Sequence, residues 1–323
     1  MQLGLVGLGR MGANMRERLR AGGIEVLGFA RHAQTRDVTS LAELAERLSP
    51  PRAVWIMVPA GKATRDTVTQ LAGLLTQGDL VIDGGNSRYS EDQLHAELLG
   101  HAGIGYLDCG VSSGGVSSGG WGRHNGYGLM VGGAVEHVER LMPVFDVLRP
   151  EGPRDESFVH AGGVGAGHFA KMVHTGMEYS LMQAYTEGFE LLHAAEMITN
   201  VPAVLKAWWR GTVVRSWLLN LLVAAVEDDP KLARLRGWMA DRGEGRWNVE
   251  EAINHAVPAP VISAALCARF ASGHSRPGEA AAAEAGATRA AMRAVAALRQ
   301  QFSGQASPES SCAENHHCAE NHH

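Results

Sequence analysis

The chain opens with a short apolar run that leads directly into a glycine motif. Leu3–Gly7 is the apolar run, and Gly7-Leu8-Gly9-Arg10-Met11-Gly12 has the pattern G-x-G-x-x-G ahead of a helical stretch. The first glycine of such a motif permits a tight turn, the second lets a ligand approach the backbone, and the third allows helix and strand to pack closely. Because a helix N-terminus attracts phosphate, we expect these six residues to bind the pyrophosphate of a dinucleotide.

Strand and helix patterns alternate through the first half of the chain. Alternation of this kind produces right-handed crossovers and a parallel sheet with helices on both faces. The glycine motif therefore lies in the βαβ context that a dinucleotide-binding Rossmann domain requires. Beyond the first strand, we expect strands at Glu25–Phe29, Ala53–Val58, Leu80–Asp83 and Gly105–Asp108, and helices between them such as Met11–Ala21 and Ser40–Leu48.

The second half has long helical patterns, punctuated by prolines, and no strand signals. We therefore expect an α/β Rossmann domain with a parallel, doubly wound sheet over residues 1–163, followed by an all-α helical domain over residues 164–306. The tail from 307 to 323 repeats Cys-Ala-Glu-Asn-His-His and is expected to be disordered. The helical runs are His168–Met197, Ala203–Trp209, Val213–Glu227, Val249–Phe270 and Ala280–Phe302.

Charge and composition exclude several classes of function. A net charge of −5 argues against nucleic acid or an anionic membrane as the main partner, so an anionic substrate needs a local cluster of Arg and Lys. No segment has the length and apolarity of a membrane span or a secretion signal, and the four cysteines form no CxxC pair. We expect a cytoplasmic protein without a dedicated metal site, and interpret any metal capture by the Cys- and His-containing tail as incidental.

The end of the second expected strand bears on the choice of dinucleotide. NAD enzymes commonly place Asp or Glu there, where the carboxylate accepts a hydrogen bond from the ribose 2′-hydroxyl. This chain has Gly28-Phe29-Ala30-Arg31-His32, with no acid at that point. Because the guanidinium of Arg31 suits a 2′-phosphate, we predict NADP as the cofactor. A merely solvated Arg31, and with it NAD as the cofactor, is the alternative.

Four polar residues share one face of an expected helix in the second half. Lys171, His174, Thr175 and Glu178 are spaced i, i+3, i+4 and i+7. An ammonium and a carboxylate two turns apart supply both members of an acid/base pair, and burial can lower the pKa of a lysine enough for it to act as a base. The alternative is an ordinary Lys–Glu pair on a solvated surface.

The segment Gly165–Tyr179 resembles the catalytic helix of the 6-phosphogluconate dehydrogenase family. Other blocks of this family occur in the same order along the chain, and the resemblance extends over about residues 1–305. The length is similar to that of the short members, whose helical domain is not duplicated. The blocks are the N-terminal glycine motif, Asp83-Gly84-Gly85-Asn86-Ser87, a Ser-Gly-Gly loop, Leu129-Met130-Val131-Gly132-Gly133, Gly243-Glu244-Gly245-Arg246-Trp247 and Val257-Pro258-Ala259-Pro260.

The resemblance implies oxidative decarboxylation of 6-phosphogluconate to ribulose 5-phosphate with reduction of NADP. Lys171 corresponds to the base that takes the 3-hydroxyl proton, and Glu178 to the acid that protonates C1 of the enediol. His174 corresponds to a residue that positions the substrate. Asn86 corresponds to a residue between nicotinamide and substrate, and we also assign Val58, Pro59 and Ala60 to the cofactor.

Substrate-binding residues also follow from the resemblance. A Ser-Gly-Gly loop binds the carboxylate end of the substrate, but this chain has two copies, so Ser112, Gly114, Gly115, Ser117 and Gly119 are all candidates. The family commonly has Asn at the position of Thr175 and His at that of Gln305. A homodimer or homotetramer is implied, in which a partner subunit supplies Arg299. Phosphate-binding positions of the family correspond to Tyr179, Arg242, Arg269 and Arg299.

Two other functions are consistent with parts of the pattern. A β-hydroxyacid dehydrogenase for a small, non-phosphorylated acid would share the Rossmann domain and the helix lysine, but the Gly-Gly-Asn-Ser block and the downstream arginines argue against it. A catalytically impaired NADP-binding protein is suggested by the duplicated loop and by Thr175.

Overall fold

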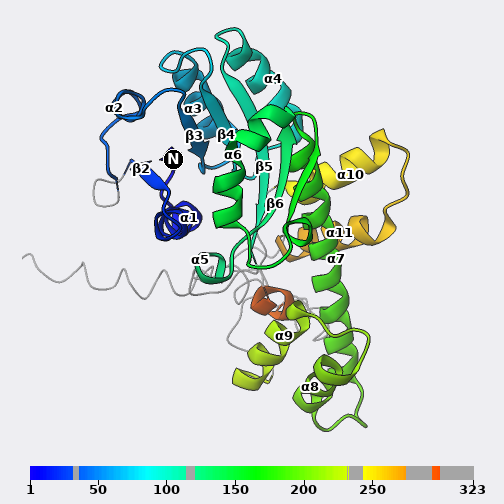
Figure 1. Cartoon of the computed structure of the whole chain (residues 1–323). Coiled ribbons are helices and arrows are strands. Elements are labelled where there is room, and N and C mark those ends of the chain that lie inside the picture. The colour runs from blue at the N-terminus through cyan, green and yellow to red at the C-terminus, as the bar shows by residue number, and fades with distance from the viewer. Residues whose placement is uncertain (32–35, 114–120, 231, 233–242, 274–292, 299–323) are drawn as a thin grey trace, which may run out of the picture. The chain divides into compact units, whose positions relative to one another are not determined.

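The computed structural model describes residues 1–31, 36–113, 121–230, 232, 243–273 and 293–298. The chain divides into two compact units: the first contains the described residues up to His174, and the second begins at Thr175. The division falls within the long helix α7 (Ala166–Ala194), which is drawn in green in Figure 1.

A seven-stranded sheet forms the centre of the first unit, in the order β2-β1-β3-β4-β5-β6-β7. The first five strands in chain order are parallel, β6 is antiparallel to β5, and β7 is parallel to β6. This is the α/β, Rossmann-like architecture that the alternating pattern predicts. The strands are β1 (Gln2–Val6), β2 (Glu25–Phe29), β3 (Ala53–Ile56), β4 (Leu80–Asp83), β5 (Gly105–Ser112), β6 (Gly128–Gly133) and β7 (Phe158–Gly162).

The last two strands were not expected from the sequence. In β6 glycines flank a core of only three apolar residues, and in β7 most positions are exposed, so neither segment has the apolar signal of a buried strand. Their place in the sheet follows from cross-strand pairing rather than from local preference. Val111 and Cys109 of β5 face Leu129 and Val131 of β6, and β7 pairs with β6. The sheet is therefore mixed rather than wholly parallel.

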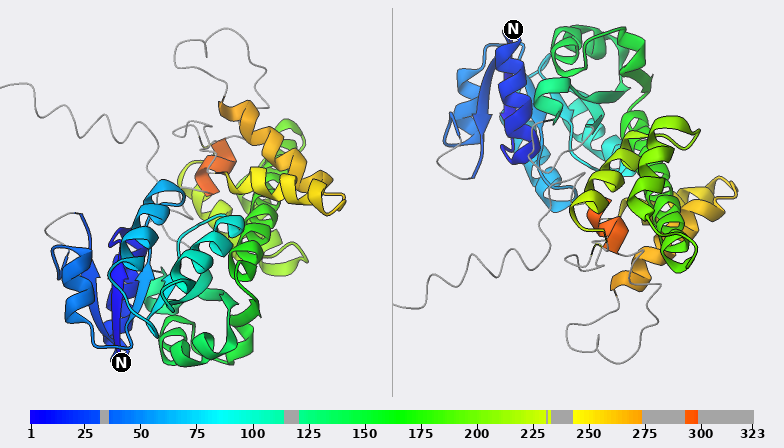
Figure 2. Two further views of the ribbon diagram at one scale, coloured as in Figure 1. Left: turned by 90° about the horizontal axis from the view of Figure 1, so that it is seen from above. Right: turned by 90° about the horizontal axis from the view of Figure 1, so that it is seen from below.

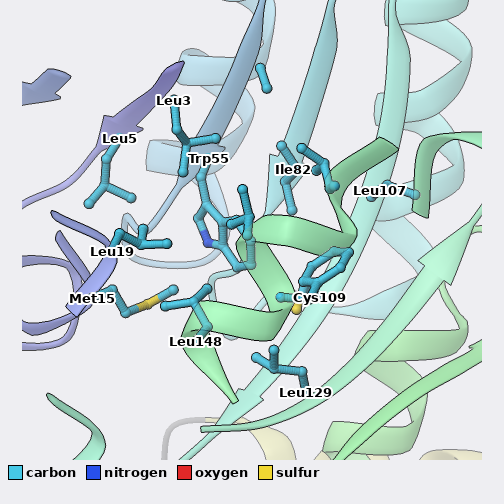
Figure 3. Packing of buried hydrophobic residues seen from close by; sticks show 14 of the residues in the cluster. Leu3, Leu5, Met15, Leu19, Trp55, Ile82, Leu107, Cys109, Leu129 and Leu148 are labelled. Atoms are coloured by element: carbon cyan, nitrogen blue, oxygen red, sulfur yellow. The ribbon is translucent and has the colours of Figure 1, made fainter. Parts of the chain in front are cut away.

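Helices cover both faces of the sheet (Figures 1 and 2). Successive side chains of a strand point to opposite faces, and β3 shows the result: Trp55 belongs to one apolar cluster, and Val54 and Ile56 to the other. The Trp55 ring lies among leucines of β1 and α1 in Figure 3. The helices of this unit are α1 (Arg10–Ala21), α2 (Leu41–Arg47), α3 (Lys62–Ala72), α4 (Tyr89–Gly100), α5 (Trp121–Asn125), α6 (Val135–Leu148) and the 3-10 turn η1 (Arg154–Glu156).

The second unit is helical throughout its described residues. After α7 come α8 (Val201–Gly211), α9 (Trp217–Asp228), α10 (Glu244–Asn254) and α11 (Pro260–Gly273), and α8 packs on α9 as α10 packs on α11. The expected single run Val249–Phe270 is wrong, because the chain turns between α10 and α11 at a segment that contains Pro258. The run from 280 lies largely outside the described residues. None of the helices in the described part is both long and apolar enough to span a bilayer.

A buried aspartate holds together the edge of the sheet at which the strands begin. Asp79, directly before β4, accepts hydrogen bonds from Thr76 N and from Arg52 Nη1, each at 2.8 Å. Burial alone would raise the pKa of Asp79, but the hydrogen bonds from Thr76 and Arg52 lower it below its ordinary value of 3.8. Asp79 therefore stabilises the fold as an anion.

We predict that Asp79→Asn lowers the free energy of unfolding by about 1–3 kcal/mol at pH 7, because a buried charge-assisted hydrogen bond is lost. A pKa lowered by folding gives stability that is present above the unfolded pKa and is lost as the pH falls through the folded one. The difference between the wild type and the variant should therefore shrink below about pH 4. Urea denaturation at pH 7 and at pH 3.5 measures both effects, and an equal difference at the two pH values would contradict the assignment.

Candidate active site

The carboxyl ends of the parallel strands bring most of the predicted residues of the first unit to one edge of the sheet. The glycine motif follows β1, Val58-Pro59-Ala60 follow β3, Asn86 follows β4, and Ser112 is the last residue of β5. Strands β2 and β3 lie on opposite sides of β1, so the chain reverses direction across the sheet there. Ligands of open α/β sheets bind in the crevice at such a reversal.

The glycine motif has the geometry of a phosphate-binding turn. Gly7 has a φ of +98°, which favours glycine, and a Cβ on Gly12 would collide with the carbonyl oxygen of Gly7. A Cβ on Gly9 would have no atom within 4 Å, and no side chain caps the N-terminus of α1. Leu8 is buried, whereas Arg10 and Met11 begin the helix. The backbone N–H groups of this first turn can therefore receive a pyrophosphate.

The end of β2 has an acidic neighbour that the sequence argument did not consider. Arg31 is exposed just beyond the strand. The Asp37 carboxylate returns to β2, where it accepts a hydrogen bond from Gly28 N at 2.7 Å and pairs with Arg20 at 2.6 Å and Arg16 at 3.5 Å. These three donors all contact Oδ2 of the one acid beside the end of β2 within the described residues.

Asp83 shapes the loop that carries Asn86. Its buried carboxylate accepts hydrogen bonds from Gly85 N at 2.9 Å and from the Ser87 hydroxyl at 2.7 Å. A Cβ on Gly84 would collide with the Trp55 ring, so only glycine allows the loop to turn over the core at this point. Asn86 is exposed between these fixed points, at the carboxyl edge of the sheet.

The first turn of α7 is held tightly against β5. The Asp108 carboxylate accepts from Gly165 N at 2.7 Å and from His168 N at 2.8 Å, which satisfies two N–H groups at the start of the helix. A Cβ on Gly110 would lie 2.5 Å from the Cβ of Lys171, and a Cβ on Gly167 would collide with backbone atoms of the sheet. Helix and strand therefore approach as closely as two glycines permit.

This close approach places Lys171 beside the end of β5. Its Nζ lies 3.3 Å from the Ser112 hydroxyl and donates to His174 Nδ1 at 3.4 Å. Loss of hydration around the ring and the adjacent Lys171 ammonium lower the pKa of His174 to about 4, although His174 keeps an exposed side. His174 is therefore neutral at pH 7, with Nδ1 as a hydrogen-bond acceptor for the lysine.

The second unit has a buried polar cluster of its own. The Arg269 guanidinium lies 3.3 Å from the centre of the Tyr179 ring, and the Tyr179 hydroxyl donates to Glu244 at 3.3 Å. Asn248 donates to the backbone oxygen of Glu244 at 2.9 Å and fills the space beside Gly176. Thr175, also predicted to bind substrate, is buried in the same unit. The cluster therefore has one cation, Arg269, stacked on an aromatic ring.

Part of the prediction falls on residues that the structure does not describe, and part of the observed site was missed. Sequence reasoning gave no role to Asp108, His168, Glu244 or Asn248. Asp108 at the end of an apolar run and Glu244 within a glycine-flanked block were the available signals. Glu178 is partly buried on α7. Outside the described residues lie Gly114, Gly115, Ser117, Gly119, Arg242, Arg299 and Gln305.

Comparison with known proteins identifies the family. Residues 2–150 match the model for the NAD binding domain of 6-phosphogluconate dehydrogenase, and residues 167–308 match that for the C-terminal domain of the same enzyme. The chain belongs to the 6-phosphogluconate dehydrogenase family. It is 41% identical over 282 residues to the NAD(+)-dependent, decarboxylating 6-phosphogluconate dehydrogenase of Haloferax volcanii, with 84% of this chain and 91% of the relative covered.

Longer members of the family are also similar. The decarboxylating enzyme of Bacillus licheniformis is 31% identical over 84% of this chain, which spans 61% of that relative. The solved 6-phosphogluconate dehydrogenase of Plasmodium falciparum aligns over 84% of this chain and 62% of its own, with a TM-score of 0.73 and 25% identity. A 3-hydroxyisobutyrate dehydrogenase of Mycobacterium tuberculosis covers 92% of this chain and 99% of its own at a TM-score of 0.68, but at 19% identity it shows the fold alone.

The glycine motif gives a prediction that separates binding from folding. Gly9→Ala should lower the melting temperature by less than Gly12→Ala, because its Cβ meets nothing in the protein, and should weaken dinucleotide binding, because the backbone can no longer approach the pyrophosphate. Gly12→Ala should lower the melting temperature as well, through the collision with Gly7. Fluorescence titration with NADP and NAD and thermal unfolding measure the two effects. Gly100→Ala, at another open position, is the control that should leave dinucleotide binding unchanged.

Proposed function

We propose that this chain catalyses the oxidation and decarboxylation of 6-phosphogluconate to ribulose 5-phosphate and carbon dioxide, with hydride transfer to a nicotinamide dinucleotide. The observation that carries the proposal is the placement of Lys171 beside Ser112, at the same edge of the sheet as the glycine motif. An amine at this edge can reach the hydroxyl of a substrate whose C–H bond faces the cofactor. Bound nicotinamide dinucleotide supplies the hydride acceptor.

Lys171 serves as the base in the oxidation step. Its neutral amine takes the proton of the substrate 3-hydroxyl as the C3 hydride leaves, which produces a 3-keto acid. The neutral His174 ring accepts a hydrogen bond from the amine and fixes its direction without adding a second positive charge. The Ser112 hydroxyl, which contacts the Lys171 amine, holds the carboxylate end of the substrate. Asn86, exposed in the loop after β4, lies between nicotinamide and substrate in this proposal.

The protonated Lys171 then assists the loss of carbon dioxide. A β-keto acid breaks the bond between C2 and its carboxylate when a cation stabilises the charge that develops on the ketone oxygen. The electron pair of that bond forms an enediol, and Glu178 delivers a proton to C1 to give the ketose. Lys171 returns its proton to solvent and Glu178 regains one from it, so the reaction has no net change in protons, consumes one oxidised dinucleotide and releases one carbon dioxide.

In this proposal the arginines and Tyr179 bind the substrate phosphate. We propose that Arg269, held against the Tyr179 ring, binds a phosphate oxygen together with Arg242 and Arg299, since guanidinium groups suit a dianion through paired hydrogen bonds. Thr175 has a hydroxyl at a position where the family commonly has the side-chain amide of Asn. A methyl-bearing hydroxyl makes fewer hydrogen bonds than an amide, so a weaker hold on the sugar hydroxyls follows.

NADP is the cofactor that we propose. Arg31 is exposed at the end of β2 and can pair with a 2′-phosphate, whereas Asp37, the acid beside that strand end, is occupied by Gly28, Arg20 and Arg16. The Haloferax relative is named NAD(+)-dependent, and the Plasmodium structure contains NADP+ as its cofactor. The similar proteins therefore include examples with either dinucleotide. For this chain, the contacts at the end of β2 favour NADP over NAD.

We also propose that the chain works as a homo-oligomer. Met177, Leu181, Leu191, Met197 and Val213 of the second unit are large apolar residues with at least 48% of their surface exposed. Association with another surface can cover exposed apolar side chains such as Met177 and Leu181, which lie one turn apart on α7. Light scattering at micromolar concentration tests this, and a monomer would contradict it.

The central prediction concerns turnover. Absorbance at 340 nm should rise on mixing the protein with 6-phosphogluconate and NADP, with carbon dioxide released in equal amount. Lys171→Ala should lower kcat by about 10²–10⁴-fold, because the base is lost. Lys206→Ala, which removes an exposed lysine paired with Glu227, should leave kcat unchanged. A wild-type protein that binds cofactor yet reduces none of it would overturn the proposal.

A second prediction concerns cofactor choice. Arg31→Ala should lower kcat/KM for NADP by about 10–100-fold, in keeping with one lost charge-assisted contact to a phosphate. The value for NAD should stay within about threefold, since NAD has no 2′-phosphate for Arg31 to contact. Initial rates with each cofactor give the ratio directly. A wild-type preference for NAD would instead contradict the proposal that Arg31 selects NADP.

A further inference from the structure

Three buried side chains, from α4, β5 and α7, contact one another in the same unit as Lys171. Asp92 of α4 and His168 of α7 are 0% and 2% exposed, and Tyr106 of β5 is 4% exposed. His168 Nδ1 lies 2.8 Å and 3.0 Å from the two oxygens of Asp92, and the Tyr106 hydroxyl donates to Asp92 at 2.8 Å. Three elements that are distant in sequence therefore meet at one carboxylate.

The chemistry of this group is that of an ion pair. Burial alone would lower the pKa of His168, but Asp92, with help from Asp83 and Asp108, raises it to about 9. Burial raises the pKa of Asp92 to about 6, against the opposing pull of His168. Between these values the histidine is a cation and the aspartate an anion. A buried pair of this kind contributes little net stability but fixes the relative position of the two groups, because removal of either leaves a buried charge.

The pair is well placed to control the orientation of α7. Asp108 fixes the backbone at the start of the helix through Gly165 N and His168 N, and so determines its position along its axis. The His168 side chain, held by Asp92 on α4, then determines the rotation of the helix about that axis. Lys171 follows one turn later on the adjacent row of side chains. A small rotation of α7 would therefore move Nζ away from Ser112.

We propose that Asp92 and His168 are positioning residues for Lys171: their buried contact sets the rotation of α7 that directs the amine to the carboxyl end of β5. This inference rests on the proposed function, in which Lys171 is the base. Both residues are buried, and on this proposal neither contacts substrate or cofactor. Their effect should therefore appear in kcat rather than in the binding of substrate or cofactor.

The test uses variants that separate positioning from stability. His168→Leu and Asp92→Asn each break the pair, and His168→Asn keeps an N–H donor at the place of Nδ1. Asp79→Asn is the matched control, because Asp79 is an equally buried, hydrogen-bonded aspartate at the opposite edge of the sheet. Each purified variant is compared with the wild type in melting temperature, NADP affinity, and kcat and KM for 6-phosphogluconate.

We expect His168→Leu and Asp92→Asn to lower kcat by about 10²-fold, the loss that follows from misplacing a reacting group by about 1 Å, with KM and NADP affinity within about threefold. His168→Asn should recover most of the lost kcat. Asp79→Asn should lower the melting temperature but leave kcat unchanged. Wild-type kcat in both pair-breaking variants, or an equal loss of kcat in the control at equal loss of melting temperature, would overturn the inference.

A second readout requires no turnover. Trace acetylation of lysines, followed by mass spectrometry of the peptides, gives the reactivity of Lys171 relative to the exposed Lys206 in the same molecule. We expect this ratio to change by more than about threefold in His168→Leu and to stay near the wild-type value in His168→Asn and Asp79→Asn. An unchanged ratio in His168→Leu would overturn the inference. If the wild type acts on no 6-phosphogluconate, the proposed function fails, and the labelling ratio still decides the positioning role.

Discussion

The capping of α7 by Asp108 is the interaction on which the arrangement of the first unit depends. A single buried carboxylate accepts from Gly165 N and His168 N, and so joins the start of the helix to the middle of β5. A negative charge is favourable at a helix N-terminus, where the N–H groups have no partner within the helix. The same carboxylate lies where a side chain on Gly132 would be, so β6 must present glycine there. One interaction therefore constrains two strands and the helix that carries Lys171.

Sequence reasoning predicted the parts of this molecule that local pattern determines. The first five strands, the helix after the glycine motif and the long helix through Lys171 follow from hydrophobic period and from glycine placement. Strand β6 has too few apolar residues to be recognised, because its stability comes from cross-strand pairing with β5. The break between α10 and α11 was missed although Pro258 marks it, since apolar residues continue on both sides. Local sequence pattern therefore does not predict an element whose position depends on tertiary contacts.

The residues of the candidate site also divide into those that the sequence predicts and those that only the structure shows. Lys171, His174 and Asn86 were identified from spacing and from family blocks, and the structure places each at or near the carboxyl edge of the sheet. The buried contacts of α7, the helix that carries Lys171 and His174, could not be found in this way. Asp92 and Tyr106 are 76 and 62 residues away from His168 in the chain, and no periodicity links them. Asp37 is a similar case, because its contact with Gly28 depends on how the chain returns to β2.

Carboxylates near the carboxyl edge of the sheet are unfavourable neighbours for two anions, a dinucleotide and a sugar phosphate. Each of these groups, however, accepts hydrogen bonds from within the chain: Asp37 from Gly28 N and Arg20, Asp83 from Gly85 N and Ser87, and Asp108 from two N–H groups of α7. A carboxylate whose lone pairs are filled by donors has its charge spread over those donors and repels an approaching phosphate less. No side chain caps the N-terminus of α1, where the helix favours an anion. Because the net charge of the chain is −5, this local pairing of charge, rather than an overall positive field, is what makes an anion site possible.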